Sequence, residues 1–152
     1  MEIAPRRPKG ITTTMLKFSI SLLSMSLGGV VYILWRTEAL LMFQWLEAIG
    51  IGERVRLLRE VAAPGREVFS DWIYFSLPQA LWLFSGLVAF SAIWGPNAEG
   101  RAKANVWSGL FLFGAFSIEL GQFLGCVPGT FDPVDLAFLA VALLCACPVT
   151  YL

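Results

Sequence analysis

The side chains best suited to chemistry in this chain are carboxylates and an amide concentrated between positions 119 and 135. Glu119 is the only carboxylate set well inside an apolar run, and Gln122 follows three residues later. Asp132 and Asp135 come after a short turn, and Asp71 opens an earlier apolar run. An ionisable group at membrane depth costs free energy unless it is paired, so Glu119 marks a functional hypothesis. Together these groups could bind a cation or a polar headgroup, or pass a proton.

The sequence contains no histidine. This absence excludes Ser-His-Asp and Cys-His catalysis, histidine-ligated haem and the usual catalytic zinc sites. We therefore predict no catalytic residue, metal site or cofactor. The three cysteines, Cys126, Cys145 and Cys147, do not resemble a disulfide framework, and we expect them to be small buried residues.

The composition is that of a membrane protein. Hydrophobic residues make up 57% of the 152 residues and charged residues 14%, and the mean hydropathy is +0.71. Apolar runs of this length do not suit the surface of a small soluble domain. Eleven basic residues balance eleven acidic ones, so no net positive field attracts nucleic acid, and nucleic acid is not an expected partner.

Four apolar runs are long enough for transmembrane helices. They lie at about 16–35, 71–94, 106–125 and 133–150. At ~1.5 Å per residue, about twenty residues span the ~30 Å of hydrocarbon in a bilayer. Thr12 to Thr14 and Ser70 suit helix caps, and the polar stretch 95–105 reads as a loop. The sequence predicts one domain, an all-α integral membrane protein with four transmembrane helices in an antiparallel bundle.

The first loop, residues 36–69, contains two amphipathic stretches. Residues 38–49 are rich in apolar side chains, including Trp45, and residues 53–62 alternate leucine and valine with Arg54, Arg56 and Arg59. Both stretches favour helices lying in the membrane interface, an interpretation compatible with a docking surface for another subunit. The i,i+4 pair of Arg56 and Glu60 adds about 0.3 kcal/mol to its helix.

Orientation follows from the basic residues. Four of them precede or open the first apolar run, at positions 6, 7, 9 and 17, and two more lie at 101 and 103. The first loop carries five arginines, but the first helix usually dominates. We expect a bacterial inner-membrane protein with both termini in the cytoplasm and the carboxylates toward the outer face.

The third apolar run places polar and small residues on adjacent stripes. Glu119 and Gln122 share one stripe, since successive residues of a helix turn by ~100°. Ser117, Gly121 and Gly125 form the second stripe, and small residues at every fourth position let another helix approach closely. The plain alternative is that Glu119 and Gln122 only hydrogen-bond helices together.

The two aspartates have a plain alternative of their own. Asp132 precedes Pro133, so its side chain suits the N-cap of the last helix, with proline at the first helical position. Asp135 can face the positive N-terminal end of that helix. Capping alone would explain both residues.

A motif within residues 115–140 carries a family resemblance. It consists of Glu119-x-x-Gln122, then Pro128-Gly129, then Asp132-x-x-Asp135. This segment resembles the VanZ-like family of small bacterial membrane proteins, named after a teicoplanin-resistance factor. Thr130 stands roughly where that family usually carries an arginine. The resemblance implies a cell-envelope protein and an architecture rather than a reaction.

Two functions of different classes fit these observations. The first is a non-catalytic envelope protein that binds a polar lipid or a cell-wall precursor headgroup through its acidic cluster. The second is a non-catalytic structural or accessory subunit of a larger membrane complex, favoured by the small size, the 14% aromatic residues and the apolar first loop. A proton or ion pathway ranks third, because only one ionisable residue lies at depth.

Overall fold

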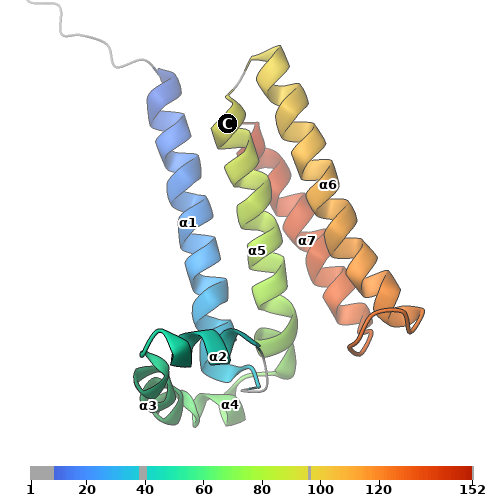
Figure 1. Cartoon of the computed structure of the whole chain (residues 1–152). Coiled ribbons are helices and arrows are strands. Elements are labelled where there is room, and N and C mark those ends of the chain that lie inside the picture. The colour runs from blue at the N-terminus through green and yellow to red at the C-terminus, as the bar shows by residue number, and fades with distance from the viewer. Residues whose placement is uncertain (1–8, 38–40, 96, 152) are drawn as a thin grey trace, which may run out of the picture.

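A computed structural model describes residues 9–37, 41–95 and 97–151, where the chain forms seven helices and no strand. Four helices are long and apolar enough to cross a membrane: α1 (Lys9–Trp35), α5 (Asp71–Trp94), α6 (Ala98–Phe123) and α7 (Pro133–Thr150). Three short helices join α1 to α5: α2 (Leu41–Ala48), α3 (Gly52–Ala62) and α4 (Gly65–Val68). Figure 1 shows the short helices gathered at one end of the long ones. The arginines at 6 and 7 and residues 38–40, which figure in the predictions, lie outside the described residues.

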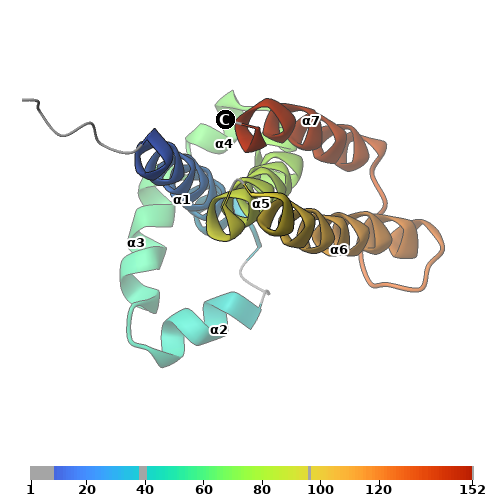
Figure 2. The same cartoon turned by 90° about the horizontal axis from the view of Figure 1, so that it is seen from above.

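The central helix is α5, which packs against α1, α6 and α7 (Figures 1 and 2). The apolar core joins one face of α5, with Leu83, Leu87 and Val88, to Leu139 and Ala146 of α7. The other three long helices keep many large apolar side chains exposed along their lengths. A helix that is apolar on every side buries one face against protein and leaves the rest for apolar surroundings.

Serine and glycine let α1 approach α5 closely. The Ser21 hydroxyl donates to the Ser85 carbonyl oxygen at 2.9 Å, and the Ser85 hydroxyl donates to the Ser21 carbonyl oxygen at 2.9 Å. Further along, a Cβ on Gly28 would lie 2.8 Å from Nε1 of Trp82, whereas a Cβ on Gly29 would meet nothing within 4 Å. Gly28 is therefore required by the packing and Gly29 is not.

Two helix boundaries differ from the sequence predictions. The first long helix begins at Lys9, ahead of the threonines expected to cap it. The helix α6 begins at Ala98, because the Asn97 side chain accepts a hydrogen bond from the Gly100 amide at 2.6 Å and caps it. Most of the polar stretch expected to form a loop therefore forms the first two turns of α6. A Lys103–Glu99 ion pair of 2.7 Å supports them.

The prediction that the cysteines are buried is wrong for the isolated chain. Cys126, Cys145 and Cys147 are all free and exposed. Cys145 and Cys147 lie on α7, whose buried face is formed by Leu139, Ala142 and Ala146 among others. One apolar side of α7 packs on α5, and the hydropathy of the sequence does not distinguish that side from the opposite one.

The short helices are attached to the end of α1 by Arg59. Its guanidinium donates hydrogen bonds to the carbonyl oxygens of Ile33 and Arg36, the second at 2.7 Å, and lies 4.8 Å from the centre of the Phe43 ring. The indole of Trp35 also donates to the carbonyl oxygen of Ala62 at 3.0 Å. Arg59 thus satisfies carbonyls at the helix C-terminus that have no partner within the helix.

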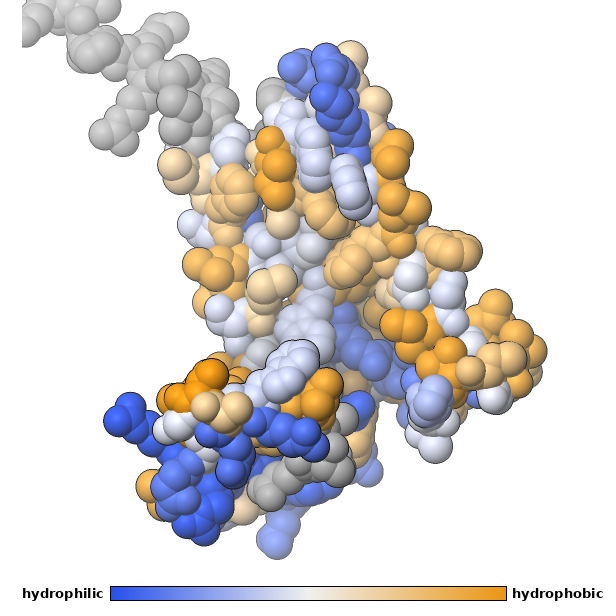
Figure 3. All heavy atoms as spheres, in the orientation of Figure 1, coloured by the Kyte–Doolittle hydropathy of each residue, from blue (hydrophilic) through white to orange (hydrophobic). Residues whose placement is uncertain are grey.

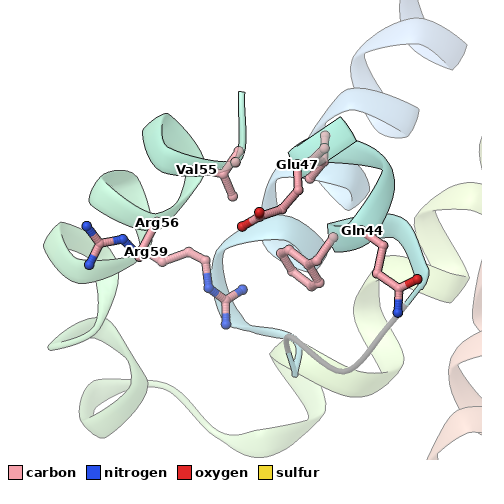
Figure 4. A pocket seen from close by; sticks show the side chains of 8 residues that line it. Gln44, Glu47, Val55, Arg56 and Arg59 are labelled. Carbon is pink, nitrogen blue, oxygen red and sulfur yellow. The ribbon is translucent and has the colours of Figure 1, made fainter. Parts of the chain in front are cut away.

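Arg56 forms ion pairs with Glu53 and Glu60 along the surface of α3. The predicted Arg56–Glu60 pair is present at 3.2 Å, and Arg56 also contacts Glu53 at 2.6 Å. The hydrogen bond that Arg56 donates to Glu53, together with the positive charge of Arg56, lowers the pKa of Glu53. Figure 4 shows the side chains of Arg56 and Arg59 pointing in opposite directions from α3. Arg59 therefore joins α3 to α1 and α2, whereas Arg56 pairs with two glutamates of α3 itself.

Candidate functional site

A polar cavity of about 520 Å³ lies where the beginnings of α5 and α7 meet the end of α6. Its lining includes four of the predicted residues, namely Asp71, Gln122, Asp132 and Asp135. Figure 3 shows hydrophilic side chains in the recess between the short helices and the α6–α7 turn. Asp71 and Asp135, which are 64 positions apart in the sequence, thus share one site.

The start of α7 gives its two aspartates different environments. Asp132 is the N-cap, and its side chain accepts a hydrogen bond from the Val134 amide at 2.9 Å. Asp135 is only 9% exposed, and its Oδ1 is buried with no hydrogen-bond partner among the residues that the structure describes. Capping accounts for Asp132, whereas the buried oxygen of Asp135 is an acceptor without a donor, which costs free energy.

The end of α6 turns the chain back toward the cavity. Gly125 has φ +70°, and the amide of Cys126 donates to the carbonyl oxygen of Gly121 at 2.8 Å, as in a Schellman motif. A Cβ on Gly121 would lie 2.5 Å from Cγ2 of Val127, so this glycine accommodates the turn. The predicted stripe of Ser117, Gly121 and Gly125 therefore does not continue along a helix, because α6 ends at Phe123.

Gln122 is held against the turn by a second glycine. Gly129 has φ +136°, and a Cβ there would lie 2.5 Å from Nε2 of Gln122. Both residues line the polar cavity together with Thr130. The glycine lets the Gln122 amide lie over the backbone of the turn, which keeps this donor and acceptor in the wall of the cavity.

Glu119 lies about one turn deeper along α6, in the wall of a second cavity of about 430 Å³ between α5, α6 and α7. Its side chain is 1% exposed, and its Oε2 is buried without a hydrogen-bond partner in the described part of the chain. Asp135 and Asp132 are near enough for their charges to act on Glu119. The second cavity is otherwise mostly apolar, with Leu83 and Leu110 in its wall.

Two residues of the site were not identified by sequence reasoning. Gln79 of α5 lines both cavities, and Arg36 at the end of α1 lines the polar one, with its guanidinium 4.9 Å from the centre of the Phe75 ring. Gln79 is an amide inside an apolar run, the same signal that singled out Gln122. Arg36 carried no such signal, because it was one of five arginines in a loop.

The remaining predicted residues lie elsewhere. Trp45 is on α2, and Arg54, Arg56 and Arg59 are on α3. Arg56 and Arg59 line a separate hollow of about 400 Å³ between α2 and α3 (Figure 4). These residues therefore shape the layer of short helices and do not line the acidic cavity.

The acidic cavity has more acidic than basic side chains. Three aspartates line it and Glu119 lies beside it, against the single guanidinium of Arg36. Within residues 9–37, 41–95 and 97–151, no group of three or more histidine, cysteine or acidic side chains is arranged to hold a metal ion. The arrangement suits a ligand that brings hydrogen-bond donors to buried carboxylate oxygens.

Comparison of the chain with protein-family models, curated proteins and solved structures returns no significant match. The likeness to the VanZ-like family therefore stays a prediction from the motif. Four helices long and apolar enough to cross a membrane support a multi-pass membrane protein.

Proposed function

We propose that this protein is a non-catalytic bacterial envelope protein that binds a polar lipid or a cell-wall precursor headgroup in its acidic cavity. The observation that carries the proposal is the pair of buried carboxylate oxygens, on Asp135 and Glu119, that lack donors beside two cavities. Buried oxygens without donors cost free energy, and a ligand that donates hydrogen bonds to them recovers it.

In this proposal the four long helices cross the inner membrane as an antiparallel bundle, with both termini in the cytoplasm and the acidic cavity near the outer face. Exposed apolar side chains along α1, α6 and α7 support insertion, because lipid can cover them. The contacts between α1 and α5 support the antiparallel arrangement: Ser21 meets Ser85, whereas Trp35 meets Tyr74.

The proposal keeps the VanZ-like resemblance as its family hypothesis. That family usually has an arginine near the position of Thr130. In this chain Arg36, at the end of α1, lines the same cavity as Thr130. Its guanidinium can pair with the acidic side chains of the cavity in place of the family's arginine.

The test is to purify the tagged protein in mild detergent from its own membrane and to identify retained molecules by native mass spectrometry. We expect one retained lipid species, which Glu119→Gln loses while the protein stays folded and in the membrane. Glu99→Gln, on the exposed first turn of the same helix, is the matched control and should retain it. Equal retention by wild type and Glu119→Gln contradicts the proposal.

The alternative is an accessory subunit of a larger membrane complex, and the layer of short helices favours it. Trp45 of α2 is 61% exposed and Val61 of α3 is 81% exposed, and both lie outside the four long helices. Large exposed apolar side chains in such a layer suit the membrane interface or a protein contact. Stoichiometric partners in the same purification, released by deletion of residues 38–49, would support this alternative.

A further inference from the structure

The two cavities adjoin at Gln79, which lines both of them. The polar cavity lies at the ends of the helices, and the second cavity runs between α5 and α6 along apolar side chains such as Leu83, Leu110 and Phe111. Their volumes, about 520 and 430 Å³, are each in the range of small-molecule sites. A single amphiphile can fill both, with its headgroup in the first cavity and the start of its chain in the second.

The charges of the site restrict the headgroup. Asp71, Asp132 and Asp135 line the polar cavity, and Glu119 lines the second cavity together with Gln79, at which the two cavities adjoin. A phosphate linkage would add a negative charge to a site whose wall holds three aspartates against one arginine, where like charges repel. At the other edge the Arg36 guanidinium needs a hydrogen-bond acceptor, which a simple ammonium headgroup does not supply. A neutral headgroup that carries both donors and acceptors meets both conditions.

The hydrogen-bonding groups suit a polyol. Oδ1 of Asp135 and Oε2 of Glu119 are acceptors without donors, whereas the amides of Gln79 and Gln122 both donate and accept. Hydroxyl groups also donate and accept, so several on one ring can satisfy carboxylate, amide and guanidinium together. The wall also contains Trp72, whose ring offers an apolar surface to the C–H bonds of a sugar.

We infer that the ligand is a neutral glycolipid, with its sugar in the polar cavity and the beginning of its chain in the apolar one. Asp135 accepts a hydrogen bond from a sugar hydroxyl. Glu119 accepts one from the ligand's hydrogen-bond donor that lies nearest its acyl chain. This inference rests on the proposed function, because it names the class of headgroup that the acidic cavity binds.

The experiment uses the full-length protein in phosphatidylcholine nanodiscs that contain equal small amounts of three lipids with identical acyl chains. These are monoglucosyl diacylglycerol, phosphatidylethanolamine and phosphatidylglycerol, and native mass spectrometry measures the enrichment of each on the protein. We expect the glucosyl lipid to be enriched about tenfold over phosphatidylglycerol, as one or two additional hydrogen bonds would give. Free glucose at the same concentration should not displace it, because the chain contributes to binding.

Two pairs of variants locate the ligand. Asp135→Asn should remove the enrichment, and Asp132→Asn, which keeps an N-cap side chain, should reduce it less. Gly114→Leu places a side chain in the apolar cavity, since Gly114 lines that cavity and a Cβ there meets nothing within 4 Å. It should lower the enrichment several-fold. Gly109→Leu is its control, because Gly109 is equally unhindered and is not part of that wall.

The outcomes separate this inference from the proposed function. Preference for phosphatidylethanolamine or phosphatidylglycerol, lost in Asp135→Asn, overturns the sugar headgroup and leaves headgroup binding intact. Enrichment of the glucosyl lipid that Gly114→Leu does not change, or that free glucose abolishes, overturns the role of the apolar cavity. Absence of any enriched lipid, from nanodiscs and from the native membrane alike, overturns both.

Discussion

Replacing Arg59 by glutamine is expected to loosen the short helices from the end of α1. The guanidinium of Arg59 donates to two carbonyl oxygens there and lies over the Phe43 ring. A hydrogen bond from a charged donor contributes about 1.5 to 3 kcal/mol, and Arg59 is half-buried, so the lower value applies to each bond. The loss is about 3 kcal/mol in the free energy of local opening, to which the ring contact adds about 0.5 kcal/mol.

Amide hydrogen exchange in detergent micelles measures this opening directly. Protection of the last turn of α1 and of α3 should fall by roughly 300-fold in Arg59→Gln, since the total of about 3.5 kcal/mol corresponds to about 2.5 factors of ten at ~1.4 kcal/mol each. Arg56→Gln is the matched control on the same helix. Its ion pairs are exposed, each is worth about 0.5 kcal/mol, and its loss should change protection less than about tenfold. Equal effects of the two variants would refute the assigned role of Arg59.

Three further predictions concern stability and ionisation. Gly28→Ala should be about 1 to 3 kcal/mol less stable than Gly29→Ala in detergent unfolding. Both variants gain helix propensity, but only the methyl group at position 28 meets the indole of Trp82. Equal stabilities would contradict the packing of α1 on α5. Asp132→Ala should cost about 1 kcal/mol through loss of the α7 cap and Asp132→Asn little, in the same assay. The pKa of the Glu53 carboxyl, measured by NMR titration, should lie below its ordinary value, and Arg56→Gln should bring it back toward that value. Any stability that this ion pair contributes is present at neutral pH and is lost as the pH falls through the lowered pKa.

Much of the candidate site could be anticipated from local sequence. Glu119 and Gln122 were identifiable because polar side chains are rare inside apolar runs, and Asp132 because it precedes a proline at a helix start. Gln79 carries the same signal as Gln122 and could have been found by the same reasoning. Arg36 could not, because nothing in a loop sequence tells which of several arginines turns toward a cavity.

Hydropathy, capping and i,i+4 spacing act over a few residues, so the sequence predicts the long apolar helices, the polar groups within them and the Arg56–Glu60 pair on α3. Only the tertiary structure decided that Asp71 and Asp135 share a cavity, that Glu119 lies at the boundary of a second one, and that Cys145 and Cys147 are exposed. The physical reason is that nearly every face of these helices is apolar. The face that packs against protein is therefore set by contacts between helices far apart in the chain.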